Sequence, residues 1–215
     1  MAERRVLALY TGLPGRLVTP SGEIESAIAK RPVEAPLRVE GDGLPGDAQV
    51  SPGHGGPDRA LCLYPSEHLG HWEARTGGPV PAPAFGQNLT SAGVLEPEVA
   101  IGETWRIGAA LVQVTQPRSP CHKVAARLGL PDLVADARAT GFVGLHLRVL
   151  EPGELAAGDA IEPVERPEHG VTVADAVRAR FARAADPRLI AAVLAAPELA
   201  AEWREKTAPR LARAA

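Results

Sequence analysis

The chain has 215 residues, of which 45% are hydrophobic and 4% aromatic, enough for a sizeable core in one large domain or in one domain with a small appendage. Its net charge of −3 lacks the basic footprint of nucleic-acid binders, and no apolar run approaches the roughly 18 residues of a membrane span, so we expect neither nucleic acid nor a membrane as a partner. The two cysteines make no disulfide framework, and the short apolar run after Arg5 is no secretory signal, so we expect a cytoplasmic protein.

Short strands separated by glycine and proline dominate the first two thirds of the chain. The 21 prolines and 22 glycines indicate many turns, and this pattern is typical of a β-barrel or curled sheet with small helices. Residues 12–28 are predicted as turns, and Ser66 is predicted to cap a helix that runs to about Arg75. The remaining predicted segments are strands or extended chain at 5–10, 30–39, 59–64, 105–107, 110–114, 145–150 and 161–164, and helices at 121–128 and 131–139.

A glycine-dense loop covers residues 41–58 and runs into the sequence HGGPDRA. Glycines let backbone N–H groups approach an anion closely, and Arg59 can donate paired hydrogen bonds to phosphate oxygens. Together with His54 and the upstream Lys30, the loop predicts an anion site, although a plain surface loop would also explain the glycines. The pattern G-x-x-x-x-G-K-[ST] is absent, so the loop is not a nucleotide P-loop.

The stretch QPRSPC, residues 116–121, places a cysteine between two cations. Its two prolines stiffen the backbone, and a helix is predicted to begin at the cysteine. The helix dipole, Arg118 and Lys123 all favour a thiolate there. We therefore interpret Cys121 as reactive, either as a nucleophile or as a metal ligand. Cys62 lies inside the apolar run ALCLY and fits an inert core residue.

Histidines offer two further interpretations. His68 and His71 are three residues apart on a predicted helix, and with His54 and Cys121 they could form a zinc site. Neither H-E-x-x-H nor C-x-x-C is present, which favours solvent-facing histidines instead. A nucleophilic pair of Cys121 with His54 or His122 is a second alternative.

The composition changes near residue 167, where three short amphipathic helices are predicted. Thr172 and Asp175 form a capping-box pattern for the first helix. Asp186 followed by proline predicts the start of the second, and Pro197 predicts the start of the third. Docking or dimerisation is the default role of such an appendage. The expected domains are 1–167 and 168–215.

These motifs occur in one order along the chain: Lys30, GLPGD, HGGPDRALCLYP, APAFGQNLT, a hairpin, QPRSPC and a three-helix tail. In that order the chain resembles the MOSC family, named for the C-terminal domain of molybdenum cofactor sulfurases. Within the family it looks like the stand-alone bacterial YiiM type, whose tail is called the three-alpha domain. The resemblance covers nearly the whole chain, and it implies a mixed β-barrel with small helices followed by a small three-helix domain.

The resemblance also implies a cofactor and its ligands. The family pocket holds the molybdenum cofactor in its molybdopterin form, a pterin dithiolene that carries a phosphate. The cysteine matching Cys121 supplies a thiolate to molybdenum and is the implied catalytic residue. The other implied cofactor-binding residues are Lys30, His54, Arg59 and Arg118 at the phosphate and pterin, and Asn88 and Ser119 at the metal or pterin.

Members of the YiiM type reduce N-hydroxylated small molecules such as hydroxylaminopurines and amidoximes. The resemblance therefore implies a molybdenum-dependent oxidoreductase. The segment GDGLPG, residues 41–46, has the spacing G-x-G-x-x-G but lies in a predicted loop and opens no predicted helix, so it is not a flavin or NAD fingerprint. No pyridoxal phosphate domain fits in the chain either, so we expect no flavin, NAD or pyridoxal phosphate. An external electron-donor protein, such as a flavin reductase, is expected instead, and a homodimer is compatible with this interpretation.

Two alternatives stay open. The first is a sulfur-carrier or cofactor-delivery module with a persulfide on Cys121, and the second is a phosphate-ligand binding module without catalysis. The chain also departs from the family pattern at two positions. Gln87 stands where relatives more often have glutamate, which we expect to alter proton supply or hydrogen bonding. His122 stands where close relatives often have an aromatic residue, which would place a protonable group near the pocket mouth.

Overall fold

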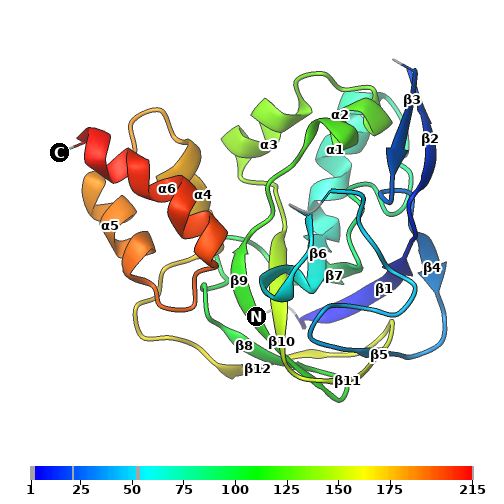
Figure 1. The fold of residues 1–215 in the computed structure, drawn as a ribbon, viewed down its shortest axis with the longest axis horizontal. Coiled ribbons are helices and arrows are strands. Elements are labelled where there is room, and N and C mark those ends of the chain that lie inside the picture. The colour runs from blue at the N-terminus through cyan, green and yellow to red at the C-terminus, as the bar shows by residue number, and fades with distance from the viewer. Residues whose placement is uncertain (1–2, 21, 52–53, 215) are drawn as a thin grey trace.

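An eight-stranded mixed sheet dominates the computed structural model, which describes residues 3–20, 22–51 and 54–214 (Figure 1). The strand order is β12-β8-β9-β10-β6-β7-β1-β4, in which β6 and β7 are parallel and the other neighbours are antiparallel. The strands of this sheet are β1 (Arg5–Thr11), β4 (Arg31–Val33), β6 (Leu61–Pro65), β7 (Leu89–Ala92), β8 (Thr104–Ile107), β9 (Ala110–Pro117), β10 (Leu145–Glu151) and β12 (Ile161–Glu165). The strands predicted from the sequence are thus confirmed, with small shifts at their ends.

The sheet curls so that β1, the second strand from one edge, contacts the start of β12, the strand at the other edge. The Val6 amide donates to the Asp159 carbonyl at 2.9 Å, and the Ile161 amide donates to the Arg4 carbonyl at 2.8 Å. Within the described residues this contact is an isolated bridge at Arg5 and Ala160, and no continuous ladder closes the sheet. The mainly β fold expected from the sequence is present, as a curled mixed sheet with small helices and a helical C-terminal part.

Two short strand pairs lie outside the large sheet. One joins β5 (Leu37–Val39) to β11 (Gly153–Leu155). The other is a hairpin of β2 (Gly15–Thr19) and β3 (Gly22–Ser26), where the sequence predicted only turns. That prediction was wrong because the hairpin packs little into the core. Because its residues are largely exposed, with Val18 at 71%, apolar and polar residues do not alternate along the strand, and the sequence carries no strand pattern there.

Small helices cover the sheet near one end (Figure 1). They are α1 (Leu69–Thr76), α2 (His122–Leu128) and α3 (Leu133–Thr140), and the last two confirm predicted helices. The predicted cap at Ser66 was wrong. A 3₁₀ turn at Ser66–His68 precedes α1, and the Ser66 hydroxyl caps neither element. The 3₁₀ turn follows β6 directly, with Pro65 at its N-cap position, so Ser66 is the first residue of the turn and not its cap.

The C-terminal helices are α4 (Val173–Phe181), α5 (Pro187–Ala195) and α6 (Ala201–Ala214). The predicted Thr172–Asp175 capping box and the Asp186 cap are both present. The predicted start of the third helix at Pro197 was wrong, because α6 begins at Ala201. Residues 197–200 form a turn that is held against the sheet, where the Ala200 amide donates to the Thr115 carbonyl at 3.1 Å.

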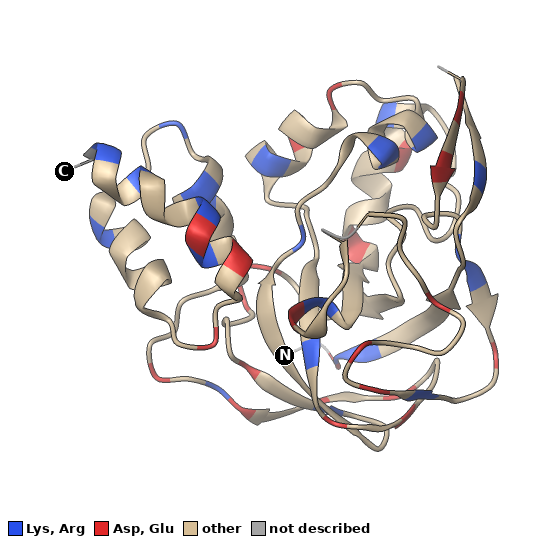
Figure 2. Ribbon diagram, viewed as in Figure 1, with Lys and Arg blue, Asp and Glu red and all other residues tan. Residues whose placement is uncertain are grey.

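The C-terminal helices share the core of the sheet. One buried cluster contains Trp105, Val112 and Val114 from β8 and β9 together with Ile190 and Trp203 from the helices. In the part of the chain that the structure describes, none of the helices is both long and apolar enough to cross a membrane. Acidic and basic residues are interspersed over the molecule (Figure 2), so the charge of a binding site depends on the residues that line it and not on an overall charge of one sign.

Candidate functional site

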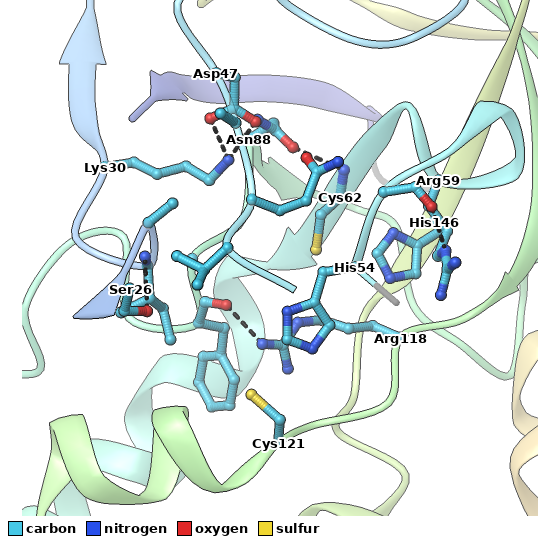
Figure 3. Close-up of a pocket in the computed structure, with 18 of the residues that line it drawn as sticks. Ser26, Lys30, Asp47, His54, Arg59, Cys62, Asn88, Arg118, Cys121 and His146 are labelled. Carbon is cyan, nitrogen blue, oxygen red and sulfur yellow. Dashed lines mark hydrogen bonds and ion pairs between the residues drawn. The ribbon is translucent and has the colours of Figure 1, made fainter. Parts of the chain in front are cut away.

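One cavity, of about 140 Å³, collects every residue that the sequence predicted for the site. We call it the main cavity (Figure 3). The predicted residues that line it are Lys30, His54, Arg59, Asn88, Arg118, Ser119 and Cys121. Such a volume holds many times the space of a single water molecule, so a small-molecule ligand fits.

Loops at strand ends bring these side chains together. Lys30 directly precedes β4, Asn88 directly precedes β7, and Arg118 directly follows β9. One glycine in these loops cannot be replaced without strain, since Gly86 has a φ of 69° and would place a Cβ 2.6 Å from Ile28. In the glycine loop, a Cβ at Gly55 would lie 1.9 Å from Gln49 Nε2, so the end of the Gln49 side chain packs against the Gly55 backbone.

A buried network fixes one side of the main cavity. The Lys30 ammonium forms an ion pair with Asp47, and the side chains are 8% and 15% exposed. Asp47 also accepts hydrogen bonds from the Gly12 amide and from Asn88 Nδ2, both at 2.9 Å. Asn88 Oδ1 in turn accepts from the Cys62 amide at 3.0 Å. The Asn88 amide is thus committed to protein partners, and it positions the Lys30–Asp47 pair.

Arg118 is a buried cation with an unused donor. Its Nη2 donates to the Phe85 carbonyl at 2.7 Å, and its guanidinium lies 5.5 Å from the centroid of the Phe85 ring. Its Nη1 is buried and has no hydrogen-bond partner in the described part of the chain. A buried charged donor without a partner is costly, so this nitrogen is suited to an anionic or acceptor-bearing ligand.

Both cysteines line the main cavity and point toward it from different sides (Figure 3). Cys121 is half-buried and is the N-cap residue of α2, with an extended backbone at φ −115° and ψ 166°. Cys62 lies in β6 and is 8% exposed. Burial raises the pKa of the Cys62 thiol, partly offset by Arg118 and Lys30, which keeps it neutral. Cys121 is the less buried of the two thiols and is therefore the one more accessible to a ligand in the cavity.

The end of the glycine loop contributes His54 and Arg59. Burial, and then the charges of Arg118, Lys123 and Arg59, lower the pKa of His54, so its imidazole is neutral at neutral pH. Arg59 lies in the 3₁₀ turn Pro57–Arg59 rather than in a strand, and its Nε donates to the Gly55 carbonyl at 3.0 Å. It also forms an ion pair with Glu202 of α6.

Several lining residues were not predicted from the sequence as part of the site. They include Asp47 and His146, and also Lys123, which was predicted only as a cationic neighbour of Cys121. Burial, Arg118 and Arg59 lower the pKa of His146 to about 3. A signal for His146 was its place as a polar residue in the apolar strand segment LHL, but nothing in the sequence locates its neighbour across the sheet.

The other candidate residues lie elsewhere. His68 Nε2 bonds to buried Glu96 at 2.7 Å, and His71 Nε2 bonds to Asp136 at 3.0 Å. Among the described residues, no group of three or more His, Cys, Asp or Glu side chains is placed to hold a metal ion, so the zinc alternative has no support. His122 is exposed and is not among the residues that line the main cavity, contrary to the expectation of a protonable group at its mouth.

Gln87 acts within its own loop. Its Oε1 accepts from the Phe85 amide at 3.0 Å, and its Nε2 donates to Thr90 Oγ1 at 2.9 Å. It is 1% exposed and is not among the described residues of the cavity wall. Of the two expected consequences of a glutamine here, the structure therefore places this side chain in hydrogen bonding rather than in proton supply.

The main cavity has a cationic lining. Lys30, Arg59, Arg118 and Lys123 face two carboxylates, those of Asp42 and Asp47. This balance and the open donor on Arg118 suit an anionic ligand, and the thiol of Cys121 can bind a soft metal.

Comparison with known proteins gives two family models. The MOSC domain model matches residues 51–162, and the YiiM-like 3-alpha helix domain model matches residues 171–214.

Individual relatives agree with these matches. Protein YiiM of Escherichia coli is 39% identical over 188 residues, which cover 86% of this chain and 83% of that protein. A protein named reductase from Gibberella moniliformis is 34% identical over 177 residues, 79% of this chain but only 31% of that longer protein. The crystal structure of YiiM from Geobacillus stearothermophilus superposes with a TM-score of 0.82 at 34% identity and covers 97% of this chain and 99% of that one.

Proposed function

The chain belongs to the MOSC family, and we propose that it is a molybdenum-cofactor-binding oxidoreductase of the YiiM type. In this proposal it reduces N-hydroxylated compounds, such as hydroxylaminopurines and amidoximes, with electrons from a separate donor protein. The relative named reductase and the extensive similarity to YiiM proteins support an oxidoreductase. We further propose a cytoplasmic protein with domains 1–167 and 168–215.

One observation carries the proposal. Seven residues matched to family roles, from four separate parts of the chain, line a single cavity. They comprise a thiol, a set of cations and polar side chains. This combination is what a ligand with both a metal and a phosphate requires.

The residues present fit the cofactor. The unpartnered Nη1 of Arg118 is a buried donor that a phosphate or pterin oxygen would satisfy. The cationic side chains would hold the phosphate, and Cys121 would supply the thiolate ligand. When bound, the cofactor supplies the electron pair that cleaves an N–O bond, and two protons complete the release of water.

The chain's own residues bind and orient in this proposal. Asn88 holds Asp47, and Asp47 pairs with Lys30. The Lys30 ammonium is therefore kept in one position at the cavity wall. His54 is neutral at neutral pH, so its imidazole can take up a proton beside the cavity and return it. Ser119 is exposed at the rim and can donate or accept a hydrogen bond.

The test is analysis of protein from a host that makes the cofactor. We expect stoichiometric molybdenum and pterin, and reduction of benzamidoxime or a hydroxylaminopurine when an electron donor is supplied. Cys121→Ala should abolish the reduction. His122→Ala is the matched control, since His122 is the exposed neighbour outside the cavity wall, and it should keep the parent's activity.

Protein with neither molybdenum nor pterin, and with unchanged activity in Cys121→Ala, would refute the proposal. Cyanide-labile sulfur on Cys121 without bound molybdenum would instead favour a sulfur-carrier or cofactor-delivery module.

A further inference from the structure

A second cavity, of about 50 Å³, lies where the C-terminal helices meet the sheet. We call it the junction cavity. His54, Arg59, Ser119 and His146 line both this cavity and the main cavity, so the two adjoin. A ligand in one can therefore extend toward the other.

The wall of the junction cavity carries three buried polar atoms without partners. They are Gln116 Oε1, His146 Nδ1 and Trp203 Nε1, and none has a hydrogen-bond partner within the described residues. Gln116 is 4% exposed and Trp203 is 1% exposed. Gln116 and His146 are register partners on β9 and β10, whereas Trp203 comes from α6. Unpaired buried polar atoms are rare, and three around one cavity indicate a site for a polar group.

The three atoms define the hydrogen bonds that the polar group must make. The amide nitrogen of Gln116 faces the Pro117 carbonyl at 3.5 Å, which leaves Oε1 as an open acceptor. Burial lowers the pKa of His146, so its ring is neutral and one of its two nitrogens is an acceptor. We assign this acceptor to Nδ1, the buried nitrogen that has no partner. The indole of Trp203 supplies one donor.

The charges around the junction cavity exclude a cationic ligand. Glu202 is the carboxylate in this wall, and it is already paired with Arg59 and Lys206. Arg180 adds a third cation, with its guanidinium 4.3 Å from the centroid of the Trp203 ring. An anion, in turn, would meet the lone pairs of two acceptors. An uncharged group avoids both conflicts.

We infer that the junction cavity is a binding subsite for an uncharged amide-like group, in which an NH₂ meets Gln116 and His146 and a neighbouring acceptor meets Trp203. The inference rests on the proposed function in one respect: it takes this group to be the part of the substrate that lies beside the reducible N–O bond in the main cavity. The C-terminal helices then complete the substrate site through Trp203.

The experiment is a titration of ¹⁵N-labelled protein with benzamide, an uncharged probe that carries an NH₂ beside a carbonyl. The indole N–H signal of Trp203, assigned by its loss in Trp203→Phe, should shift, and those of Trp72 and Trp105 should not. Benzoate and benzamidinium share the same ring with an anionic or cationic head, and they should bind at least about tenfold more weakly.

Substitutions test the acceptor side of the subsite. Gln116→Met should weaken benzamide binding about tenfold and raise the KM for benzamidoxime with little change in kcat. Gln113→Met is the matched control on the same strand, outside both cavity walls, and should bind as the parent does. If Gln116→Met does not fold, saturation-transfer NMR of benzamide with Trp203→Phe tests the donor side, again with about tenfold weaker binding expected.

Three outcomes would overturn the subsite: an unmoved Trp203 signal, tighter binding of benzoate, or a crystal grown with benzamide whose junction cavity holds ordered water only. The titration needs no turnover. If the protein contains no molybdenum but its Trp203 signal shifts, the subsite is supported and the proposed function is refuted. If the enzyme is active but its Trp203 signal does not move, only the subsite is refuted.

Discussion

His146 shows how strongly a buried setting changes one residue. It lies on β10 between Gln116 of β9 and Cys62 of β6, with its Nδ1 shielded from solvent. Burial and two nearby guanidinium groups lower its pKa to about 3. The ring therefore stays neutral in the folded protein throughout the range in which an exposed histidine becomes charged.

A pH-dependent stability follows for this residue. In the unfolded chain the pKa of histidine is about 6.5, so between about pH 6.5 and pH 3 the unfolded state binds more protons than the folded state. Stability therefore falls as pH falls through this window. His146→Gln removes this titration, so between pH 6 and pH 4 we expect it to lose about 1 kcal/mol less per pH unit than the parent. Urea unfolding at several pH values measures both slopes, and parallel slopes would contradict the prediction.

The cationic residues of the site could be predicted from the sequence, but their partners could not. Lys30, Arg59 and Arg118 each lie within two residues of a proline, which is a local pattern. Asp47 and Glu202, which pair with Lys30 and Arg59, come from other segments. Cys62 looked like core because its strand is apolar on both sides in sequence. Only the fold shows that it also borders the main cavity.

At the scale of elements, the cap of α4 gives a sharp test. Thr172 accepts a hydrogen bond from the Asp175 amide at 3.0 Å, and Asp175 accepts from the Thr172 amide at 2.9 Å. Thr172→Ala should lower the free energy of unfolding by about 1 kcal/mol, since it removes an N-cap acceptor. Thr172→Ser should restore most of this, and chemical denaturation measures both changes.

Ser66→Ala is the matched control for the cap. Ser66 caps neither the 3₁₀ turn nor α1, so its loss should change the free energy of unfolding by less than about 0.5 kcal/mol. A cost at Ser66 equal to that at Thr172 would mean that the hydroxyl itself, rather than its capping bond, determines the loss.

Elements were predictable where a local chemical signal decided their limits. The hairpin of β8 and β9 and the caps of α4 and α5 follow from alternation, glycine and capping residues. The hairpin of β2 and β3 was not predicted, because apolar and polar residues do not alternate along its exposed strands. The start of α6 was predicted wrongly, because the Ala200 amide bonds to β9, which is far away in sequence, and this contact keeps residues 197–200 out of the helix.

At the scale of the whole molecule, the sheet and the C-terminal helices should unfold together. Trp203 and Ile190 belong to the same buried cluster as Trp105, and Arg148 Nη2 donates to the Glu198 carbonyl at 3.0 Å. Because the parts share one core, we expect coincident urea transitions in tryptophan fluorescence and far-ultraviolet circular dichroism. Two separated transitions would show instead that the helices are held only by a weak interface.

The arrangement of the strands also governs how the protein is made. On β1, Leu9 pairs with both Val33 and Leu89, and Arg5 meets Ala160. Strand β1 is thus made well before the residues that it pairs with, which is a topology that folds slowly. The junction cavity needs Trp203 of α6 as well. A nascent chain therefore carries an unpaired edge on β1 until these partners have been made. It gains the junction cavity only after α6 has been released, whereas the residues of the main cavity lie between Ser26 and His146 and are made earlier.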